Sequence, residues 1–191
     1  MRTANQHDRS DEGWTYLTQG PFKDFNSYLD WMERTCNSDD PLFFAYVNKE
    51  TNQAIRCGAL MRTHPALGVI EIGNIKLLPL LQRRPMATEV MHLKMAHAFE
   101  LGYRRYEWKS DVLNTPSRRA GVRLGFTFEG VFRKANHYKG RSRDTAWYSI
   151  TDDEWPPIHG VYLAWLDASN FDIEGRQLRP LSSFLTKARP T

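Results

Sequence analysis

The feature that most constrains this sequence is a strand–helix–strand pattern between residues 69 and 109. An apolar run rich in β-branched residues comes first and predicts a strand. A helix then opens at Pro85, because proline suits the first turn, where its missing N–H costs nothing. The apolar residues on one face of this helix are Ala87, Met91, Met95 and Ala98. A second strand follows over residues 105–109, so the connection predicts a parallel strand pair.

The rest of the chain predicts further elements around this unit. They are a helix over residues 21–36, strands over 41–48 and 54–64, a short helix over 114–124, a strand hairpin over 126–150 and a helix over 154–171. We therefore expect an α/β (α+β) fold, with a mixed, mostly antiparallel, twisted sheet flanked by helices and a C-terminal helix. We expect one domain over residues 1–191, with 1–13 disordered and 176–191 a loop or tail.

Composition argues against several classes of protein. The sequence is 41% hydrophobic, as in ordinary globular domains, and has no apolar run long enough for a membrane span. Its polar start, MRTANQHDRSDEGW, lacks the apolar core of a signal peptide. The two cysteines, Cys36 and Cys57, have no metal-ligand spacing, so we expect no metal site and a cytoplasmic protein.

The net charge of +4 is compatible with three kinds of partner: nucleic acid, a membrane surface or an anionic small molecule. The basic residues fall in separate short clusters, which fits a pocket for an anionic small molecule at least as well as a nucleic-acid track. One cluster, Arg83–Arg84, directly precedes Pro85. A helix N-terminus carries unpaired N–H groups and partial positive charge, so this stretch predicts a pyrophosphate site. Two surface arginines in a solvated loop are the alternative.

Three motifs in a fixed order resemble one enzyme family. Gln82 to Ala87 matches a Gln/Arg-x-x-Gly-x-Gly/Ala signature, except that Pro85 replaces the first glycine. NTPSRRAGVRLGF resembles a helix with an Asn-x-x-Ser opening and a Leu-Gly-Phe ending, and FTFEGVFRKANHYKGRSRDTAWYSI resembles a terminal hairpin. From Pro41 to Pro156 the chain resembles the GNAT N-acetyltransferases, and within them the ribosomal-protein N-terminal acetyltransferases (RimJ/RimL-like).

The resemblance implies acetyl-CoA as the cofactor. Loop amides and arginines would hold its phosphates, and the pantetheine arm would pair with the exposed edge of the strand before the long helix. The residues implied to bind it are Ile75, Lys76, Leu77, Gln82, Arg83, Arg84, Met86, Ala87, Thr88, Asn114 and Ser117.

Acetyl transfer to an amine needs a proton acceptor and stabilisation of the leaving thiolate. Glu71 is the candidate base, because a charge in mid-strand among β-branched residues is unusual. A strand glutamate that faces solvent or pairs with an arginine is the alternative. Many family members use a tyrosine as general acid where this chain has Gly121. Ser117, one turn earlier on the same helix face, could instead hydrogen-bond the leaving sulfur, or could simply cap the helix.

The acceptor side is expected between the early helix and the terminal hairpin. Aromatic side chains there would suit an amine on an apolar or cationic body. They are Trp14, Tyr16, Phe22, Tyr138 and Trp147. The alternative is that most of them belong to the core. In relatives a strand and a longer helix precede this region, whereas here the residues before Trp14 are polar and none predicts a strand.

We therefore expect an N-acetyltransferase that moves the acetyl group of acetyl-CoA to a primary amine by direct attack in a ternary complex. The amine could belong to a small molecule or a protein N-terminus. A catalytically silent module that binds acyl-CoA is the alternative, which Gly121 favours. A small nucleic-acid-binding protein is a third reading, and the lack of a continuous basic helix argues against it. We expect no nucleic-acid or membrane partner, and a homodimer is left open.

Overall fold

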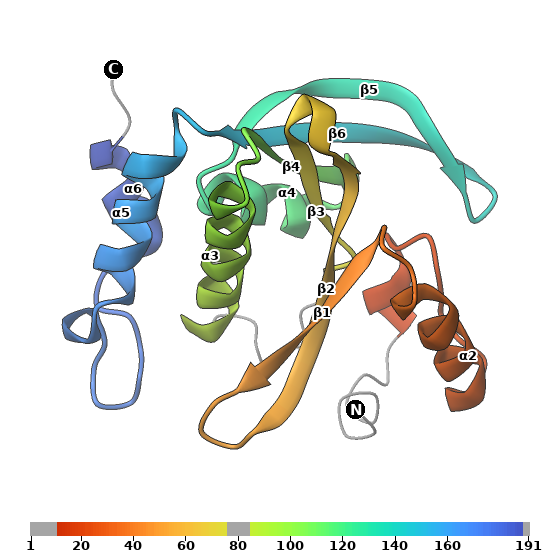
Figure 1. The fold of residues 1–191 in the computed structure, drawn as a ribbon, viewed down its shortest axis with the longest axis horizontal. Coiled ribbons are helices and arrows are strands. Elements are labelled where there is room, and N and C mark those ends of the chain that lie inside the picture. The colour runs from red at the N-terminus through yellow and green to blue at the C-terminus, as the bar shows by residue number, and fades with distance from the viewer. Residues whose placement is uncertain (1–10, 76–84, 189–191) are drawn as a thin grey trace.

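A computed structural model describes residues 11–75 and 85–188 of the chain (Figure 1). Its described strands form one sheet in the order β1-β2-β3-β4-β6-β5. The strands are β1 (Leu42–Asn48), β2 (Gln53–His64), β3 (Val69–Gly73), β4 (Arg105–Asp111), β5 (Thr127–Tyr138) and β6 (Arg141–Thr151). Strands β3 and β4 are parallel, and every other neighbouring pair is antiparallel. The predicted mixed, mostly antiparallel sheet is confirmed.

The helices cover the sheet from two sides. They are α2 (Phe25–Cys36), α3 (Pro85–Glu100), α4 (Thr115–Arg123), α5 (Trp155–Leu166) and α6 (Leu181–Ala188), with short 3-10 turns η1 (Asp11–Trp14), η2 (Pro65–Leu67) and η3 (Ala168–Asn170). Helix α3 begins at Pro85, as predicted. In Figure 1, α3 and α5 lie on one side of the sheet and α2 on the other. Alternation along β1 accounts for this, because Phe43 contacts Trp31 of α2 while Phe44 packs against the core.

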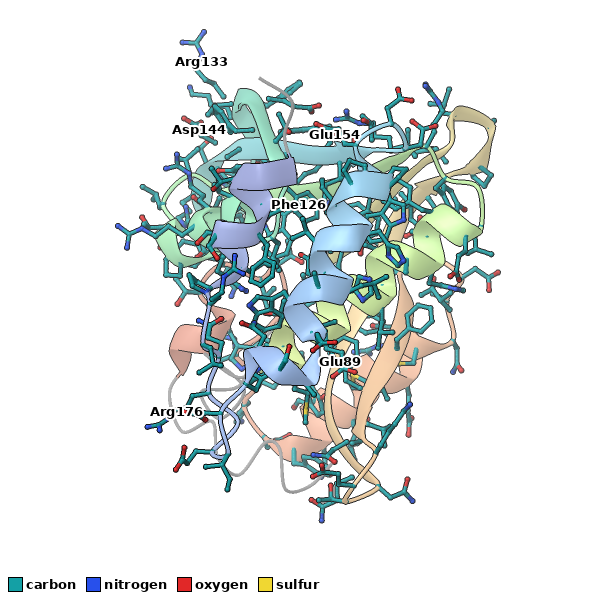
Figure 2. All side chains as sticks on the ribbon, turned by 90° about the vertical axis from the view of Figure 1, so that its left-hand side faces the viewer. Glu89, Phe126, Arg133, Asp144, Glu154 and Arg176 are labelled. Carbon is teal, nitrogen blue, oxygen red and sulfur yellow. The ribbon has the colours of Figure 1, made fainter. Side chains whose placement is uncertain are left out.

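One hydrophobic core fills the space between the sheet and helices α3 to α6. Its largest members include Tyr106, Trp108, Tyr148 and Ile150 from the sheet and Met91, Met95, Phe126, Ile158, Tyr162 and Leu185 from the helical side. Figure 2 shows Phe126 between the sheet and the helices. The predicted apolar face of α3 is confirmed, because its Ala87, Met91, Met95 and Ala98 are all buried.

Strand β4 sits in the middle of the sheet and is buried on both faces. Tyr106 and Trp108 point into the hydrophobic core. The alternate residues Glu107, Lys109 and Asp111 point to the opposite face. That face carries charged side chains at low solvent exposure, which is unusual and requires them to be paired.

The prediction for the C-terminal end of the chain was wrong, and the prediction for the N-terminal end is tested only at residues 11–13. Residues 176–191 were expected to be a loop or tail, but α6 occupies Leu181–Ala188. Leu181 and Leu185 are one helical turn apart and both are buried against the core, so tertiary packing stabilises a helix that would be marginal alone. At the other end, the expected disorder over residues 1–13 conflicts with the 3-10 turn at Asp11–Trp14. Residues 1–10 lie outside the described residues.

Candidate active site

The parallel pairing of β3 and β4 ends early. It runs from Val69–Arg105 to Ile72–Trp108. Beyond this point β4 continues to pair with β6 as far as Asp111, whereas β3 ends at Gly73. Within the described residues, the facing backbone edges past this last pair are therefore not used by the ladder. Such an edge can accept an extended ligand through main-chain hydrogen bonds.

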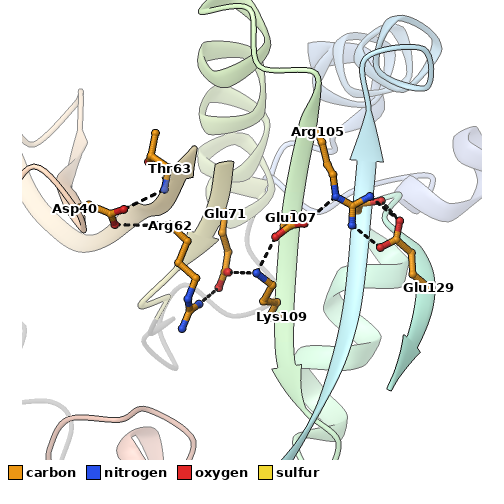
Figure 3. A network of polar contacts seen from close by, with 9 residues as sticks. Asp40, Arg62, Thr63, Glu71, Arg105, Glu107, Lys109 and Glu129 are labelled. Atoms are coloured by element: carbon orange, nitrogen blue, oxygen red, sulfur yellow. Dashed lines mark hydrogen bonds and ion pairs between the residues drawn. The ribbon is translucent and has the colours of Figure 1, made fainter. Parts of the chain in front are cut away.

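Glu71 lies one residue before the end of this pairing, on the sheet face opposite the hydrophobic core. Its side chain is 4% exposed, and both carboxylate oxygens are engaged. Oε1 accepts from Arg62 Nη1 at 2.6 Å, and Oε2 lies 2.8 Å from Lys109 Nζ (Figure 3). Of these two cations, Arg62 is the more exposed, at 48%, against 11% for Lys109.

The ion pairs continue across the sheet from Lys109. Its Nζ is 2.7 Å from Glu107 Oε2 and 3.8 Å from the centre of the Trp147 ring. Arg105 then bridges Glu107 and Glu129, as Figure 3 shows. Burial opposes ionisation of Glu107, but hydrogen bonds from Lys109 and Arg105 outweigh it and lower the pKa of Glu107. The face is a chain of alternating charges in which Glu71 and Glu107 are each paired with two cations.

A bulge in β2 aims Arg62 at Glu71. Arg62 has a φ of 48°, in the left-handed region, where the register with β3 shifts. Asp40 fixes this conformation, because its two carboxylate oxygens accept from the backbone N–H groups of Arg62 and Thr63 at 2.8 and 3.0 Å. The segment before β1 therefore determines which side chain reaches Glu71.

Ser117 lies on the core side of the same strand ends. Asn114 caps α4 by accepting from the Ser117 N–H at 3.1 Å, so Asn114 and not Ser117 is the capping residue. The Ser117 hydroxyl accepts from Trp108 Nε1 at 3.2 Å. Because the indole can only donate, the hydroxyl proton of Ser117 points elsewhere and is available to another acceptor. Gly121 lies over the same indole, and a Cβ atom added at this glycine would lie 3.6 Å from Trp108 Cδ1.

The start of α3 holds the described part of the predicted phosphate site. Ala87 and Thr88 are buried, and Met86 is partly exposed. Thr88 Oγ1 accepts from Arg123 Nη1 at 3.2 Å. The exposed Arg123, at the end of α4, therefore places a cation at the first turn of α3, and it was not among the predicted site residues. Lys76, Leu77, Gln82, Arg83 and Arg84 lie outside the described residues, and Ile75 follows β3.

A second polar cluster lies where β4 ends. The carboxylate of Asp111 accepts from Tyr138 Oη at 2.9 Å and from Arg141 Nη2 at 2.7 Å. Tyr16 approaches from the N-terminal segment, and its hydroxyl donates to the Leu113 carbonyl at 3.1 Å. Burial opposes ionisation of Asp111, but the Leu113 N–H and Arg141 outweigh it and lower its pKa. This cluster ties the hairpin and the N-terminal segment to the strand that carries Lys109.

The predicted substrate aromatics divide into two groups. Trp14 and Phe22 contact each other with ring centres 5.2 Å apart, and both contact Trp31 of α2. The other three instead contact charged side chains: Tyr16 lies near Arg141, Tyr138 donates to Asp111, and Trp147 contacts Lys109. For Trp14 and Phe22 the contacts are those of a packed aromatic cluster, which was the alternative reading. The charged residues Lys109, Arg141 and Arg143 were not predicted, although strand alternation in RYEWKSD places Lys109 on one face with Glu107.

Two further kinds of feature are absent from residues 11–75 and 85–188. No group of three or more His, Cys, Asp or Glu side chains there could hold a metal ion. No helix in this part of the chain is both long and apolar enough to cross a membrane.

Comparison with solved structures gives extensive matches. A GCN5-related N-acetyltransferase from Brucella melitensis is 45% identical with a TM-score of 0.92, over 96% of this chain and 84% of that one. A probable GNAT-family acetyltransferase from Chromobacterium violaceum is 38% identical with a TM-score of 0.75, over 79% of this chain and 76% of that one. A spermidine N-acetyltransferase from Vibrio cholerae, in complex with CoA and spermine, shares the fold at 16% identity and a TM-score of 0.63, over 80% of this chain and 89% of that one.

Two comparisons use the sequence alone. No curated protein matches the chain. The family model described as Acetyltransferase (GNAT) family matches residues 7–126. This range includes Glu71, Ser117 and the start of α3. The chain belongs to the GNAT acetyltransferase family.

Proposed function

We propose that the protein is an acetyl-CoA-dependent N-acetyltransferase that acts on a primary amine by direct attack in a ternary complex. The observation that carries the proposal is the early end of the β3–β4 pairing at Ile72 and Trp108. Glu71 lies on one face of the sheet there, and Ser117 approaches from the other through Trp108. A thioester held in line with the strand edges would then have a hydroxyl donor on its sulfur side and a carboxylate on its carbonyl side.

The described residues fit the cofactor on two counts. Past Ile72 and Trp108, the facing edges of β3 and β4 pair with no other strand among the residues that the structure describes, and they offer main-chain groups for an amide-containing arm. The first turn of α3 offers helix N–H groups, with Arg123 beside Thr88 as a cation for a phosphate. Acetyl-CoA would supply the activated acetyl group when bound. We assign its binding to Ile75, Met86, Ala87, Thr88, Asn114 and Ser117, with Lys76, Leu77, Gln82, Arg83 and Arg84 by the sequence motif.

We assign the role of base to Glu71, which takes the proton of the attacking ammonium. Both of its oxygens are engaged, so an amine reaches it by displacing a cation or through one water. Arg62 is the cation to be displaced, because its side chain is half-exposed whereas Lys109 is enclosed. The Lys109 contact persists and keeps the carboxylate in one orientation.

We assign stabilisation of the leaving thiolate to Ser117. Trp108 occupies its acceptor side, which directs the hydroxyl proton away from the indole. A hydrogen bond from Ser117 to the sulfur would stabilise charge that develops only as the thioester breaks. Gly121 stands where many relatives have a tyrosine, so water completes the protonation of a thiolate.

The acceptor amine belongs to a small molecule or to a protein N-terminus. Tyr16, Tyr138 and Trp147 lie beside the charged face and are the better-supported acceptor contacts, ahead of Trp14 and Phe22. Acceptors of the RimJ/RimL-like branch, which are ribosomal-protein N-termini, remain within this proposal. A homodimer is not required by any of the contacts used here.

A catalytically silent acyl-CoA-binding module is the second candidate. It is favoured by Gly121 and by the ion pairs that already occupy Glu71. The two candidates agree on cofactor binding and differ on turnover.

Thermal melting with saturating acetyl-CoA, CoA, ATP and NAD tests the shared part. A ligand at about 100 times its Kd adds roughly 2.7 kcal/mol to the free energy of unfolding, which is a shift of several degrees for a domain of this size. We expect a shift with acetyl-CoA and CoA only. A screen of amines by release of free CoA thiol then separates the candidates, since the silent module gives binding without release. No shift with either CoA species would contradict both.

A further inference from the structure

Arg143 stands out among the charged side chains of the face that carries Glu71. It lies on β6 and shares a face with Trp147, four residues on, whose ring contacts Lys109. Its guanidinium carbon is 5.8 Å from the centre of the Tyr138 ring. The charged groups close enough to influence it are Asp111, Arg62 and Glu71. Arg143 therefore lies within electrostatic range of both the base candidate and the cluster at the end of β4.

Arg143 is half-buried, and its guanidinium has no hydrogen-bond or ion-pair partner within the described residues. Its Nε is buried and donates to no group in the described part of the chain. No ion pair within residues 11–75 and 85–188 includes it either. Burial lowers the pKa of Arg143, which measures the cost of holding this charge away from water. An unpaired buried donor is costly and marks a place where a partner is missing.

The neighbouring charges cannot supply that partner. Glu71 is paired with Arg62 and Lys109, and Asp111 is paired with Arg141. Each carboxylate within range of Arg143 is thus already neutralised by another cation. Arg143 therefore contributes a positive charge that neither carboxylate balances. This charge lies on the side of the sheet from which an amine would approach Glu71.

We propose that the acceptor is an amine that also carries a carboxylate, and that Arg143 binds this carboxylate while the amine faces Glu71. The inference rests on the proposed acetyl transfer and specifies its substrate class. Guanidinium and carboxylate form paired, charge-assisted hydrogen bonds, which fix orientation as well as affinity. A polyamine fits poorly, because its second ammonium would meet Arg62, Arg141 and Arg143.

The test compares amines in matched pairs on the full chain. The first pair is a free amino acid and its amide. The second pair is a peptide that begins with an acidic residue and the same peptide with the isosteric amide residue. Spermidine is tested beside them. We expect kcat/KM for the carboxylate member to exceed that of its amide by roughly 10- to 100-fold, the range of a charge-assisted hydrogen bond. The amino-acid and peptide arms identify which kind of carboxylate is read. Equal or better use of the amides or of spermidine would overturn the inference.

Substitution assigns the preference to one side chain. Arg143→Gln is expected to lower kcat/KM for the carboxylate member by that same roughly 10- to 100-fold and to leave the amide member nearly unchanged. Arg143→Lys, which keeps the charge, is expected to restore part of the preference. Arg133→Gln is the matched control, since Arg133 is exposed and projects from the hairpin away from the molecule (Figure 2). A preference that survives in Arg143→Gln would assign it elsewhere and contradict the proposal.

A binding measurement keeps the inference testable apart from turnover. Melting of the CoA-loaded chain is followed with an N-acetylated amino acid and with its amide. We expect stabilisation by the acid alone, and its loss in Arg143→Gln but not in Arg133→Gln. If no amine releases thiol while the acid still stabilises, the proposed transfer fails and the carboxylate site stands. If thiol is released but neither readout favours the carboxylate, the transfer stands and this inference fails.

Discussion

At the scale of single residues, the two proposed catalytic roles belong to side chains on opposite faces of the sheet. Glu71 is reached from the charged face, and Ser117 is held from the core face by Trp108. Each is fixed by a neighbour that does not itself react: Lys109 for the carboxylate and the indole for the hydroxyl. This arrangement makes the two roles separable by substitution.

Ser117→Ala tests the thiolate role at this scale. We expect kcat to fall about tenfold or more with little change in KM, because the bond to sulfur strengthens only in the transition state. The deficit should not depend on pH, because a serine hydroxyl does not titrate in this range and the thioester sulfur carries no proton to lose. The steady-state rate of thiol release across pH measures this. Ser142→Ala, at an exposed position near the start of β6, is the control, and an unchanged kcat in Ser117→Ala would leave Ser117 with a structural role only.

Lys94 gives a second prediction about one side chain. It is buried on α3, where its Nζ lies 3.9 Å from the centre of the Phe44 ring, and burial lowers its pKa to about 8. A lysine with a lowered folded-state pKa destabilises the fold below that pKa. The penalty disappears as pH rises from about 8 toward its unfolded value near 10.4. The stability of the wild type should therefore rise through this window.

Lys94→Met removes the buried charge. We expect it to raise the free energy of unfolding by about 1–3 kcal/mol at pH 7 and to flatten the rise above pH 8. Urea denaturation at pH 7 and pH 9.5 measures both effects, with Lys23→Met, at an exposed site, for comparison. A destabilised Lys94→Met chain would show that contact with Phe44 outweighs the cost of burial.

At the scale of elements, the irregular parts and ends of the strands determine where the side chains of the site lie. The β2 bulge turns Arg62 toward Glu71, and within the described residues the pairing of β3 with β4 ends at Ile72 and Trp108. Helix α4 begins just after β4 and brings Ser117 to the same point. Irregular strand ends next to a site are typical of sheets that must aim a side chain.

Asp40→Ala tests the bulge. Removal of the carboxylate frees the N–H groups of Arg62 and Thr63, so we expect a loss of about 1–2 kcal/mol in the free energy of unfolding. Arg62 would then no longer be directed at Glu71, and KM for the amine should change more than the affinity for CoA. Chemical denaturation and steady-state kinetics measure these, with Asp39→Ala as the control. If CoA affinity falls instead, the bulge supports the cofactor side.

At the scale of the whole molecule, periodicity predicted more than any single motif did. The face of α3, the parallel pair and the terminal hairpin followed from apolar spacing, and the structure confirms them. Glu71 was singled out because a charge in a β-branched strand is exceptional, and it proves to be almost completely buried.

The rest required strand register, which a sequence does not give. Lys109 on β4 pairs with Glu71 on β3, and Arg105 on β4 pairs with Glu129 on β5, so no local spacing reveals these two pairings. The surplus charge of Arg143 becomes visible only once the partners of its neighbours are known. Helix α6 was missed because eight residues form a stable helix only with tertiary contacts, here those of Leu181 and Leu185.

The central claim is that Glu71 serves transfer rather than cofactor binding, and Glu71→Gln measures it most directly. The variant leaves Arg62 and Lys109 facing an uncharged amide, so its melting temperature is checked first. Glu129→Gln, at the far end of the same network, is the matched control. With the amine found in the screen, we predict that Glu71→Gln lowers kcat by about 10²- to 10⁴-fold while the Kd for CoA is unchanged. Turnover within a few fold of the wild type, or a loss of CoA affinity in place of rate, would contradict the account.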